Sequence, residues 1–198
     1  MKEIDATIAH YQASVPYYTQ AFDDRHSRHL DGFLDRLTTE AHILELGCGT
    51  GRDAARMEAR GFRVDATDGT PAMLVKAKQR YGIEARLMRF DELEACEVYD
   101  AVWAHACLFH VPQARLPDIL SRIRKSLKPG GWQSASFKLG SQEGVDDRGR
   151  WNSLIGRDRI EKLYRDAGFG IEDIVEWSGA GADGVERAWV TLTVRRGD

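Results

Sequence analysis

The chain has 198 residues, of which 42% are hydrophobic and 30% are charged, so neither a disordered chain nor a membrane-embedded one is expected. Its formal net charge of −3 does not supply the broad basic surface of a protein that binds duplex nucleic acid. The N-terminal residues lack the apolar core of a secretory signal, and no apolar run approaches the roughly 20 residues of a membrane span. The sequence therefore predicts a cytoplasmic protein of one domain.

The cysteines and histidines show no pattern typical of a metal site. Cys48, Cys96 and Cys107 are odd in number and are not spaced like metal ligands, and the histidines form neither HxH nor HExxH. We expect reduced thiols, as in other cytoplasmic proteins, and no bound metal.

The order of predicted elements begins with helices and continues as an alternation. Residues 4–37 have helical periodicity, with Pro16 marking a break or a fresh start. Short apolar strands are then expected at residues 42–46, 62–67, 84–90, 99–105, 132–138, 171–177 and 186–195. Further helices are expected at residues 53–60, 71–80, 112–127 and 157–167.

These repeated strand–helix units predict the α/β class, with a doubly wound sheet of about seven, mostly parallel strands. The last two strands are joined by a glycine-rich turn at residues 179–184 and are expected to form an antiparallel hairpin at one edge. Residues 1–38 are expected to be an N-terminal helical lid, and residues 39–198 the core of the domain. Residues 140–152 are expected to be an irregular loop at the end of the sheet where ligands bind.

The segment from Ile43 to Gly51, ILELGCGTG, combines a short strand, a turn of small residues and the start of a helix. Its glycines allow the backbone to turn tightly and to approach a ligand. Asp68 follows at the end of the next strand, where a carboxylate can accept hydrogen bonds from ribose hydroxyls. The pattern predicts a site for a cofactor that contains a ribose.

Dinucleotide-binding proteins use a similar loop, and the glycine spacing separates the two classes. Their GxGxxG pattern would require glycine at position 52, but this position is Arg52 and the third glycine is Gly51. A pyrophosphate is bound by a helix N-terminus, whereas the carboxylate of Asp53 would suit an ammonium group better. The spacing therefore favours a cofactor with an amino-acid tail.

Four motifs in this order, ELGCGTG, ATDGTPAML, YDAVWAHACLFHV and LKPGG, resemble those of class I S-adenosylmethionine-dependent methyltransferases. The resemblance extends from about Ala41 to the C-terminus. It implies a Rossmann-like fold and methyl transfer from S-adenosylmethionine, with S-adenosylhomocysteine as the product. The segments GRDA and SFK resemble, more narrowly, small bacterial methyltransferases related to the tellurite-resistance type.

The resemblance also implies which residues contact the cofactor. They are Glu45, Gly47, Cys48, Gly49, Gly51, Arg52, Asp53, Asp68, Gly69, Met73, Phe90, Asp91, Ala104, His105 and Tyr18. The three loop glycines and Glu45 would line the methionine part, Asp68 would bind the ribose hydroxyls, and Phe90 or Asp91 would hold the adenine. Arg52 and Asp53 would reach the methionine carboxylate and amino groups, or else serve only as charges in the first turn of their helix. The family often has Ser or Pro after the strand-two acid, and Gly69-Thr70 departs from that pattern.

The candidate catalytic residues are His105 and His110, at and just beyond the end of the fourth strand. Either could act as a general base, which is needed only if the acceptor must lose a proton. Alternatively, His110 only packs or caps its loop. Tyr11, Tyr17 and Tyr18 are expected to pack on the sheet, with Tyr18 the preferred lid contact. Lys138, Arg150 and Trp151 flank the loop after the fifth strand and either bind an anionic or aromatic acceptor or belong to a solvated loop.

The function that these features predict is transfer of a methyl group to a small-molecule acceptor. Methylation of RNA or of a protein side chain is the first alternative, which the acidic composition disfavours. A protein that binds S-adenosylmethionine without catalysis is the second. We expect no membrane partner, and a monomer or a homodimer.

Overall fold

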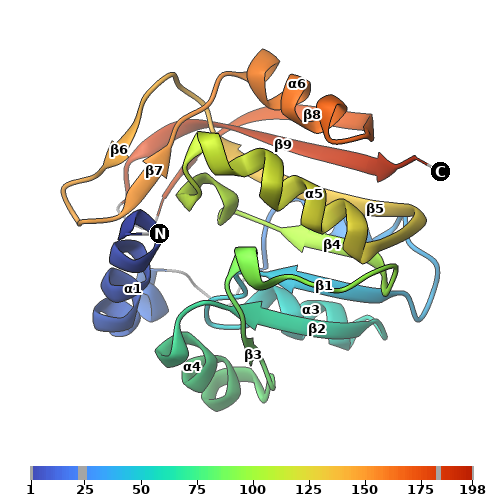
Figure 1. The fold of residues 1–198 in the computed structure, drawn as a ribbon. Coiled ribbons are helices and arrows are strands. Elements are labelled where there is room, and N and C mark those ends of the chain that lie inside the picture. The colour runs from blue at the N-terminus through green and yellow to red at the C-terminus, as the bar shows by residue number, and fades with distance from the viewer. Residues whose placement is uncertain (1, 22–25, 182–183, 198) are drawn as a thin grey trace.

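The parallel part of the sheet consists of β1 (His42–Leu46), β2 (Arg63–Asp68), β3 (Arg86–Leu87), β4 (Tyr99–Ala104) and β5 (Leu127–Lys138). Two further strands, β8 (Phe169–Ala180) and β9 (Glu186–Arg196), complete a seven-stranded sheet with the order β3-β2-β1-β4-β5-β9-β8. β9 is antiparallel to both of its neighbours. The computed structural model describes residues 2–21, 26–181 and 184–197. The predicted fold class, including the antiparallel C-terminal hairpin at one edge, is confirmed (Figure 1).

Helices cover both faces of the sheet because alternate residues of the buried strands are apolar on both sides. Ile43 of β1 packs with α2 (Leu30–Leu34) and α3 (Arg52–Ala59) on one face. Leu44 of the same strand faces the cluster of α5 (Leu116–Ser126) and α6 (Arg157–Asp166) on the other. α4 (Pro71–Tyr81) packs beside α3, next to β2. The result is a three-layer α/β/α arrangement.

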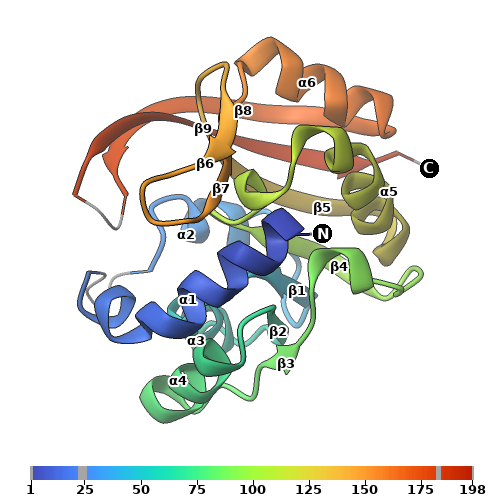
Figure 2. The same ribbon diagram turned by 60° about the vertical axis from the view of Figure 1, so that its left-hand side comes forward.

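The long helix α1 (Lys2–Ala21) crosses the carboxyl ends of the parallel strands, between α4 and a small hairpin (Figure 2). The expected break at Pro16 is wrong, because α1 continues through this proline. Proline in a helix interior removes one backbone hydrogen bond and costs about 3 kcal/mol. Tyr11 and Tyr18, on either side of it, are both anchored by side-chain hydrogen bonds, which offset this cost.

The small hairpin consists of β6 (Glu143–Val145) and β7 (Trp151–Ser153), which pair antiparallel. The expectation of an irregular loop over residues 140–152 is therefore wrong. Asp146 explains the turn, since its carboxylate accepts hydrogen bonds from the backbone N–H groups of Arg148 and Arg150. Strands of three residues are too short to produce a recognisable alternation of apolar and polar residues.

Three other element boundaries differ from those expected. β3 is only two residues long, because the chain leaves this exposed edge for a 3₁₀ turn (Phe90–Glu92) whose start is capped by the Glu92 carboxylate. α5 begins at Leu116 rather than at Pro112, which places Pro117 in the first turn, where proline is tolerated. β5 begins at Leu127, five residues before the expected start. The expected turn at residues 179–184 includes residues 182 and 183, which lie outside the described residues.

Candidate active site

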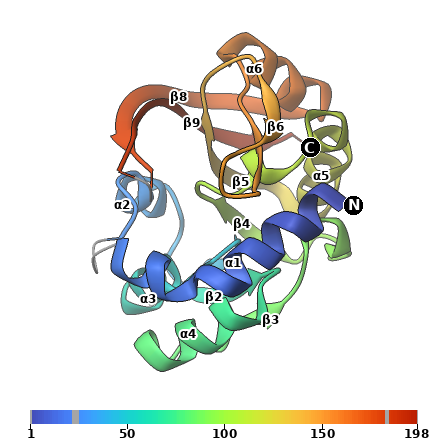
Figure 3. The same ribbon diagram turned by 90° about the vertical axis from the view of Figure 1, so that its left-hand side faces the viewer.

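A cavity of about 630 Å³ lies at the carboxyl ends of the parallel strands. Its floor is formed by the segments that follow β1, β2 and β4 and by Lys138 at the end of β5, and its roof by α1 together with Arg150, which precedes β7. Figure 3 shows α1 crossing the ends of the strands. Because the strands are parallel, their carboxyl ends meet at one edge of the sheet, and the sequence motifs that follow them meet there too.

The glycine loop between β1 and α3 forms one wall of this cavity. Gly47 has φ of 70°, and a Cβ atom there would lie 2.7 Å from the Cβ of Cys107. Gly51 has φ of 84°, and its added Cβ would lie 2.9 Å from the Cβ of Ala77 on α4. Only glycine satisfies both the backbone angle and the close approach at these two positions. Close packing against Cys107 and Ala77 therefore fixes the course of the loop.

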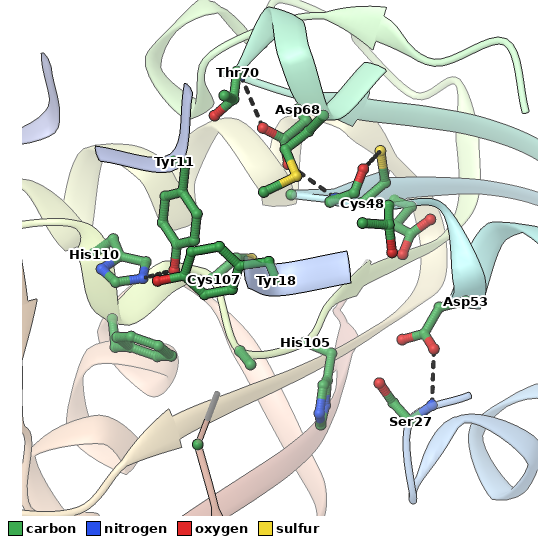
Figure 4. Close-up of a pocket in the computed structure, with 18 of the residues that line it drawn as sticks. Tyr11, Tyr18, Ser27, Cys48, Asp53, Asp68, Thr70, His105, Cys107 and His110 are labelled. Atoms are coloured by element: carbon green, nitrogen blue, oxygen red, sulfur yellow. Dashed lines mark hydrogen bonds between the residues drawn. The ribbon is translucent and has the colours of Figure 1, made fainter. Parts of the chain in front are cut away.

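Asp68 ties the glycine loop to the end of β2. Its carboxylate accepts hydrogen bonds from the backbone N–H of Gly49 at 2.9 Å and of Thr70 at 2.8 Å (Figure 4). Burial raises the pKa of Asp68 above its usual value, against the lowering effect of these two bonds. Each carboxylate oxygen can accept a further hydrogen bond, so Asp68 can both fix the loop and bind a ligand hydroxyl in the cavity that it lines.

Glu45 lines the same cavity and is only 3% exposed. Its Oε2 atom is buried and has no hydrogen-bond partner among the described residues. Burial, together with the negative charge of Asp53, raises the pKa of Glu45 well above its usual value. A buried carboxyl oxygen without a partner costs free energy, and a cationic or hydrogen-bond-donating ligand group would remove that cost.

Asp53 has a structural role in addition to lining the cavity. Its two oxygens accept hydrogen bonds from the backbone N–H of Ser27 at 2.8 Å and from the indole N–H of Trp103 at 2.9 Å. Arg52, beside it, donates to the hydroxyl of Ser27 at 3.2 Å. The two residues therefore fix the segment that precedes α2 against the glycine loop.

His105 follows β4 and belongs to a series of nearly parallel aromatic rings. Its ring lies 5.4 Å from that of Trp103 and 6.4 Å from that of Trp177, which in turn lies 5.3 Å from that of Trp189. The His105 Nδ1 atom is hydrogen-bonded to Ser136 Oγ at 3.1 Å. Burial lowers the pKa of His105 to about 4, so the ring is neutral at neutral pH.

His110 is bonded through both ring nitrogens. Nδ1 donates to the carbonyl oxygen of Trp151 at 2.6 Å, because a carbonyl can only accept, and Nε2 therefore accepts from the Tyr11 hydroxyl at 2.8 Å. Burial lowers the pKa of His110 to about 3. A general base works best with a pKa near the working pH. The geometry therefore favours His110 as an anchor for Tyr11.

The roof is held down by hydrogen bonds between α1 and the segments across the cavity. Besides Tyr11 and His110, the Thr7 hydroxyl accepts from the backbone N–H of Trp151 at 2.8 Å. The Tyr18 hydroxyl accepts from the guanidinium of Arg150 at 2.9 Å. These bonds lie along one side of α1 and join it to the β6–β7 hairpin and to the turn after β4.

Most of the residues predicted from the sequence to be cofactor-binding or catalytic line this cavity. Those that line it are Tyr18, Glu45, Gly47, Cys48, Gly49, Arg52, Asp53, Asp68, Gly69, Met73, Phe90, His105 and His110. Gly51, Asp91 and Ala104 are not among the lining residues. Ala104 is fully buried in the core, and Asp91 forms ion pairs with Arg89 and Arg115.

Sequence reasoning missed a second set of lining residues, which are mostly aromatic or small. The main ones are Thr70, Cys107, Phe109, Trp177 and Trp189. Trp177 and Trp189 face each other across the β8–β9 ladder. The signal available in the sequence was weak, since only the known register of this ladder would place two distant tryptophans opposite each other.

Residues 43–131 match the family model described as a methyltransferase domain. The chain is 29% identical over 168 residues to a malonyl-[acyl-carrier protein] O-methyltransferase of Salmonella typhimurium, covering 78% of this chain and 64% of that protein. It is 27% identical over 185 residues to an N-terminal Xaa-Pro-Lys N-methyltransferase of Bos taurus, covering 86% and 81%. Residues 43–131 therefore carry an S-adenosylmethionine-dependent methyltransferase domain.

The fold comparison agrees with this methyltransferase domain. A 1,6-didemethyltoxoflavin-N1-methyltransferase of Burkholderia thailandensis, solved with bound 1,6-didemethyltoxoflavin and S-adenosylhomocysteine, has a TM-score of 0.73 and 24% identity. The match covers 86% of this chain and 78% of that one. The chain spans less than two thirds of the length of most of the curated relatives that it matches.

The methyltransferase domain takes S-adenosylmethionine as its cofactor, and the chemistry of the cavity fits this molecule. The orphaned oxygen of Glu45 suits the ammonium group of an amino-acid tail. The loop at Gly47 and Gly49 brings bare backbone to the cavity, and Asp68 offers acceptor positions for hydroxyl groups.

Among the described residues, no group of three or more His, Cys, Asp or Glu side chains is placed to hold a metal ion. Within the same residues, no helix is both long and apolar enough to cross a membrane.

Proposed function

We propose that this methyltransferase transfers the methyl group of S-adenosylmethionine to a small-molecule acceptor. The observation that carries the proposal is the roof over the cavity, in which Thr7, Tyr11 and Tyr18 bond α1 to the opposite wall. A roof bonded at these points leaves little room for a folded protein or a nucleic-acid strand beside the cofactor. A small molecule can be enclosed there with the cofactor, away from water.

In this proposal the cofactor lies along one wall of the cavity, with its amino-acid tail at one end and its adenosine part at the other. Its amino-acid tail would lie along Gly47 and Gly49, with the ammonium group at Glu45. Its ribose would bind Asp68, and its adenine would lie near Phe90 and Met73, which line the same wall. His105 and the stacked tryptophans would then border the space left for the acceptor.

Methyl transfer requires mainly that the acceptor atom is held in line with the methyl group of the cofactor. The bound cofactor supplies a methyl group on a sulfonium: the bond from carbon to sulfur breaks as the bond to the acceptor forms, and S-adenosylhomocysteine leaves. Holding two reactants in line can contribute an effective molarity on the order of 10⁵ M or more. The low pKa values of His105 and His110 make both side chains weak bases, so we propose that they orient groups rather than remove a proton.

The main competing proposal is methylation of a protein, because one of the relatives named above is an N-terminal Xaa-Pro-Lys N-methyltransferase. The fold alone does not separate the two proposals. A finer relation to the tellurite-resistance type of small methyltransferase also stays a prediction. A screen of small acceptors beside a peptide that begins Xaa-Pro-Lys would separate the first two, through release of S-adenosylhomocysteine.

The cofactor part of the proposal is tested by calorimetry with S-adenosylmethionine, S-adenosylhomocysteine and NAD. We expect micromolar binding of the first two ligands and none of NAD. Asp68→Ala should weaken binding of S-adenosylhomocysteine by about 1–3 kcal/mol, because a charge-assisted acceptor is lost. Asp118→Ala, on the exposed face of α5, is the control and should bind as the wild type does. Unchanged affinity in Asp68→Ala would show that the ribose is not bound there.

A further inference from the structure

Ser136, a buried residue of β5, is hydrogen-bonded to the turn that follows β4. Its Oγ atom lies 2.8 Å from the backbone nitrogen of Ala106 and 3.1 Å from Nδ1 of His105. Ala106 has φ of 53°, a backbone conformation that is uncommon for a residue with a Cβ atom. Ser136 therefore holds both the strained backbone of this turn and the ring of His105.

The direction of these two hydrogen bonds follows from the protons that are available. A backbone N–H can only donate, so Ser136 Oγ accepts from Ala106. The serine hydroxyl keeps its own proton, and within the described residues His105 Nδ1 is the acceptor in reach of it. Ser136 is 0% exposed, and a buried hydroxyl without an acceptor costs free energy. The hydroxyl therefore donates to Nδ1, which is then the unprotonated nitrogen of the ring.

A neutral imidazole whose Nδ1 atom accepts a hydrogen bond carries its proton on Nε2. The ring of His105 is neutral at neutral pH, because burial lowers its pKa to about 4. Among the described residues, no group is hydrogen-bonded to its Nε2 atom. Since His105 lines the cavity, its Nε2–H group is a donor that is open to a bound molecule.

The direction in which this donor points is fixed by the neighbouring rings. The plane of His105 lies within 5° of that of Trp103 and within 11° of that of Trp177. An imidazole N–H lies in the plane of its ring, so turning the donor away would disturb this parallel arrangement and break the bond to Ser136. A donor that is oriented before a ligand arrives is expected of a binding residue.

We propose that the Nε2–H group of His105 binds the methyl acceptor through a lone pair on an oxygen or an unprotonated ring nitrogen, and that Ser136 is the positioning residue that sets this tautomer. The inference rests on the proposed function, because His105 borders the space that we assign to the acceptor. A protonated amine has no lone pair and cannot bind at this position. His105 is then a donor to the acceptor rather than its general base.

The tautomer is tested first, by ¹⁵N NMR of protein labelled at its histidines, with His105→Gln used to assign the signals. At about pH 7.5 we expect a proton bonded to Nε2 and none on Nδ1. Ser136→Ala should move the Nδ1 signal, because its hydrogen bond is lost. Ser134→Ala removes another buried hydroxyl from β5 and should leave that signal in place. A proton on Nδ1 in the wild type overturns the proposal, and this result does not depend on whether Ser136→Ala folds.

The binding role is tested with two flat probes of nearly equal shape, isoquinoline and naphthalene, on protein saturated with S-adenosylhomocysteine. Only isoquinoline offers a lone pair on a ring nitrogen. We expect it to bind about tenfold more tightly than naphthalene, as one hydrogen bond allows, and to shift the Nε2 signal of His105. His105→Phe keeps a flat ring but has no donor, so it should remove the difference between the probes.

Binding of S-adenosylhomocysteine is measured in every variant, because it separates this inference from the proposed function. If the wild type does not bind it, the proposed function fails and the acceptor role of His105 falls with it, even where NMR confirms the tautomer. If it binds normally but the two probes bind alike, or isoquinoline does not bind at millimolar concentration, the donor role alone is refuted. A preference for isoquinoline that survives in His105→Phe also overturns it.

Discussion

Glu45 brings function and stability into conflict within one side chain. Its carboxyl group is buried, its Oε2 atom has no partner among the described residues, and its pKa is raised well above 4.5 by burial and by Asp53. Between pH 4.5 and that raised pKa, unfolding allows Glu45 to lose its proton. Its contribution therefore makes the free energy of unfolding fall as the pH rises. The same carboxyl group is the one that we assign to the cofactor's ammonium group.

Glu45→Gln should separate these two effects. The amide cannot ionise, so the variant should gain stability over the wild type as the pH rises from about 5 to about 8. It should also bind S-adenosylhomocysteine more weakly, by about 1.5–3 kcal/mol, since a charged hydrogen bond is lost. Thermal unfolding across this pH range and calorimetry at pH 8 measure the two effects. A constant difference in stability at all pH values would contradict the raised pKa.

At the residue scale, prediction from sequence succeeded where a motif is local and failed where a contact is distant. Gly47, Glu45 and Asp68 lie within or just after a short motif, and all three line the cavity. Trp177 and Trp189 also line it, but they reach it through strands that follow the cofactor loop by more than a hundred residues. Their place depends on the register of β8 and β9, and a shift by one residue would turn both rings to the other face.

Among the elements, α1 is held by two sets of contacts. One set joins it to α4 and to the segment after β3, where Gln12, Thr19 and Asp5 accept hydrogen bonds from Ala72, Arg80 and Arg89. The other set crosses the cavity. Three of these bonds come from Thr7, Tyr11 and Tyr18, at 2.8, 2.8 and 2.9 Å. α2 is different, since Leu30 and Phe33 are buried in the same cluster as Trp103 of β4. We therefore propose that only α1, and not the whole of residues 1–38, acts as a lid.

A triple variant, Thr7→Val with Tyr11→Phe and Tyr18→Phe, tests the lid. Each of the three lost hydrogen bonds costs about 0.5–1.5 kcal/mol, so S-adenosylhomocysteine should dissociate roughly 10- to 1,000-fold faster, as measured by stopped-flow mixing. Asp118→Ala, on the exposed face of α5, serves as the control. An unchanged dissociation rate, with helix content retained by circular dichroism, would mean that α1 does not gate the site.

The same contacts explain which elements could be predicted. The sequence predicts β1 at residues 42–46, where it is found, because a short and mostly apolar segment ends at a glycine. The continuation of α1 through Pro16 and the pairing of β6 with β7 depend on Arg150, Tyr18 and Asp146, which are distant in sequence or form a local turn network. The formation of these elements depends on tertiary packing, which outweighs the local conformational propensity of their residues.

For the whole molecule, we propose one folding unit. The cluster of α2 and α3 and the cluster of α5 and α6 share the strands β1 and β4, whose alternate residues enter both. Neither cluster can be lost without exposing the strands of the other. Thermal unfolding should therefore give a single transition, with tryptophan fluorescence and far-ultraviolet circular dichroism in agreement.

Saturation with S-adenosylhomocysteine should raise the unfolding temperature by the same amount whether it is followed by tryptophan fluorescence or by circular dichroism. At a ligand concentration about 100 times the dissociation constant, binding adds about 2.7 kcal/mol to the free energy of unfolding. Two separate transitions, or a shift in only one probe, would show that the chain has two independently folding parts.

The position of β9 has a consequence for synthesis of the chain. β8 emerges from the ribosome before β9, yet in the folded sheet it lies outside β9 and does not pair with β5. Until residues 186–196 are available, the edge of β5 keeps its backbone N–H and C=O groups unpaired, which is a template for aggregation. The strand that protects the nascent chain is also the one that carries Trp189, so the aromatic wall of the cavity and a closed sheet are completed in the same step of translation.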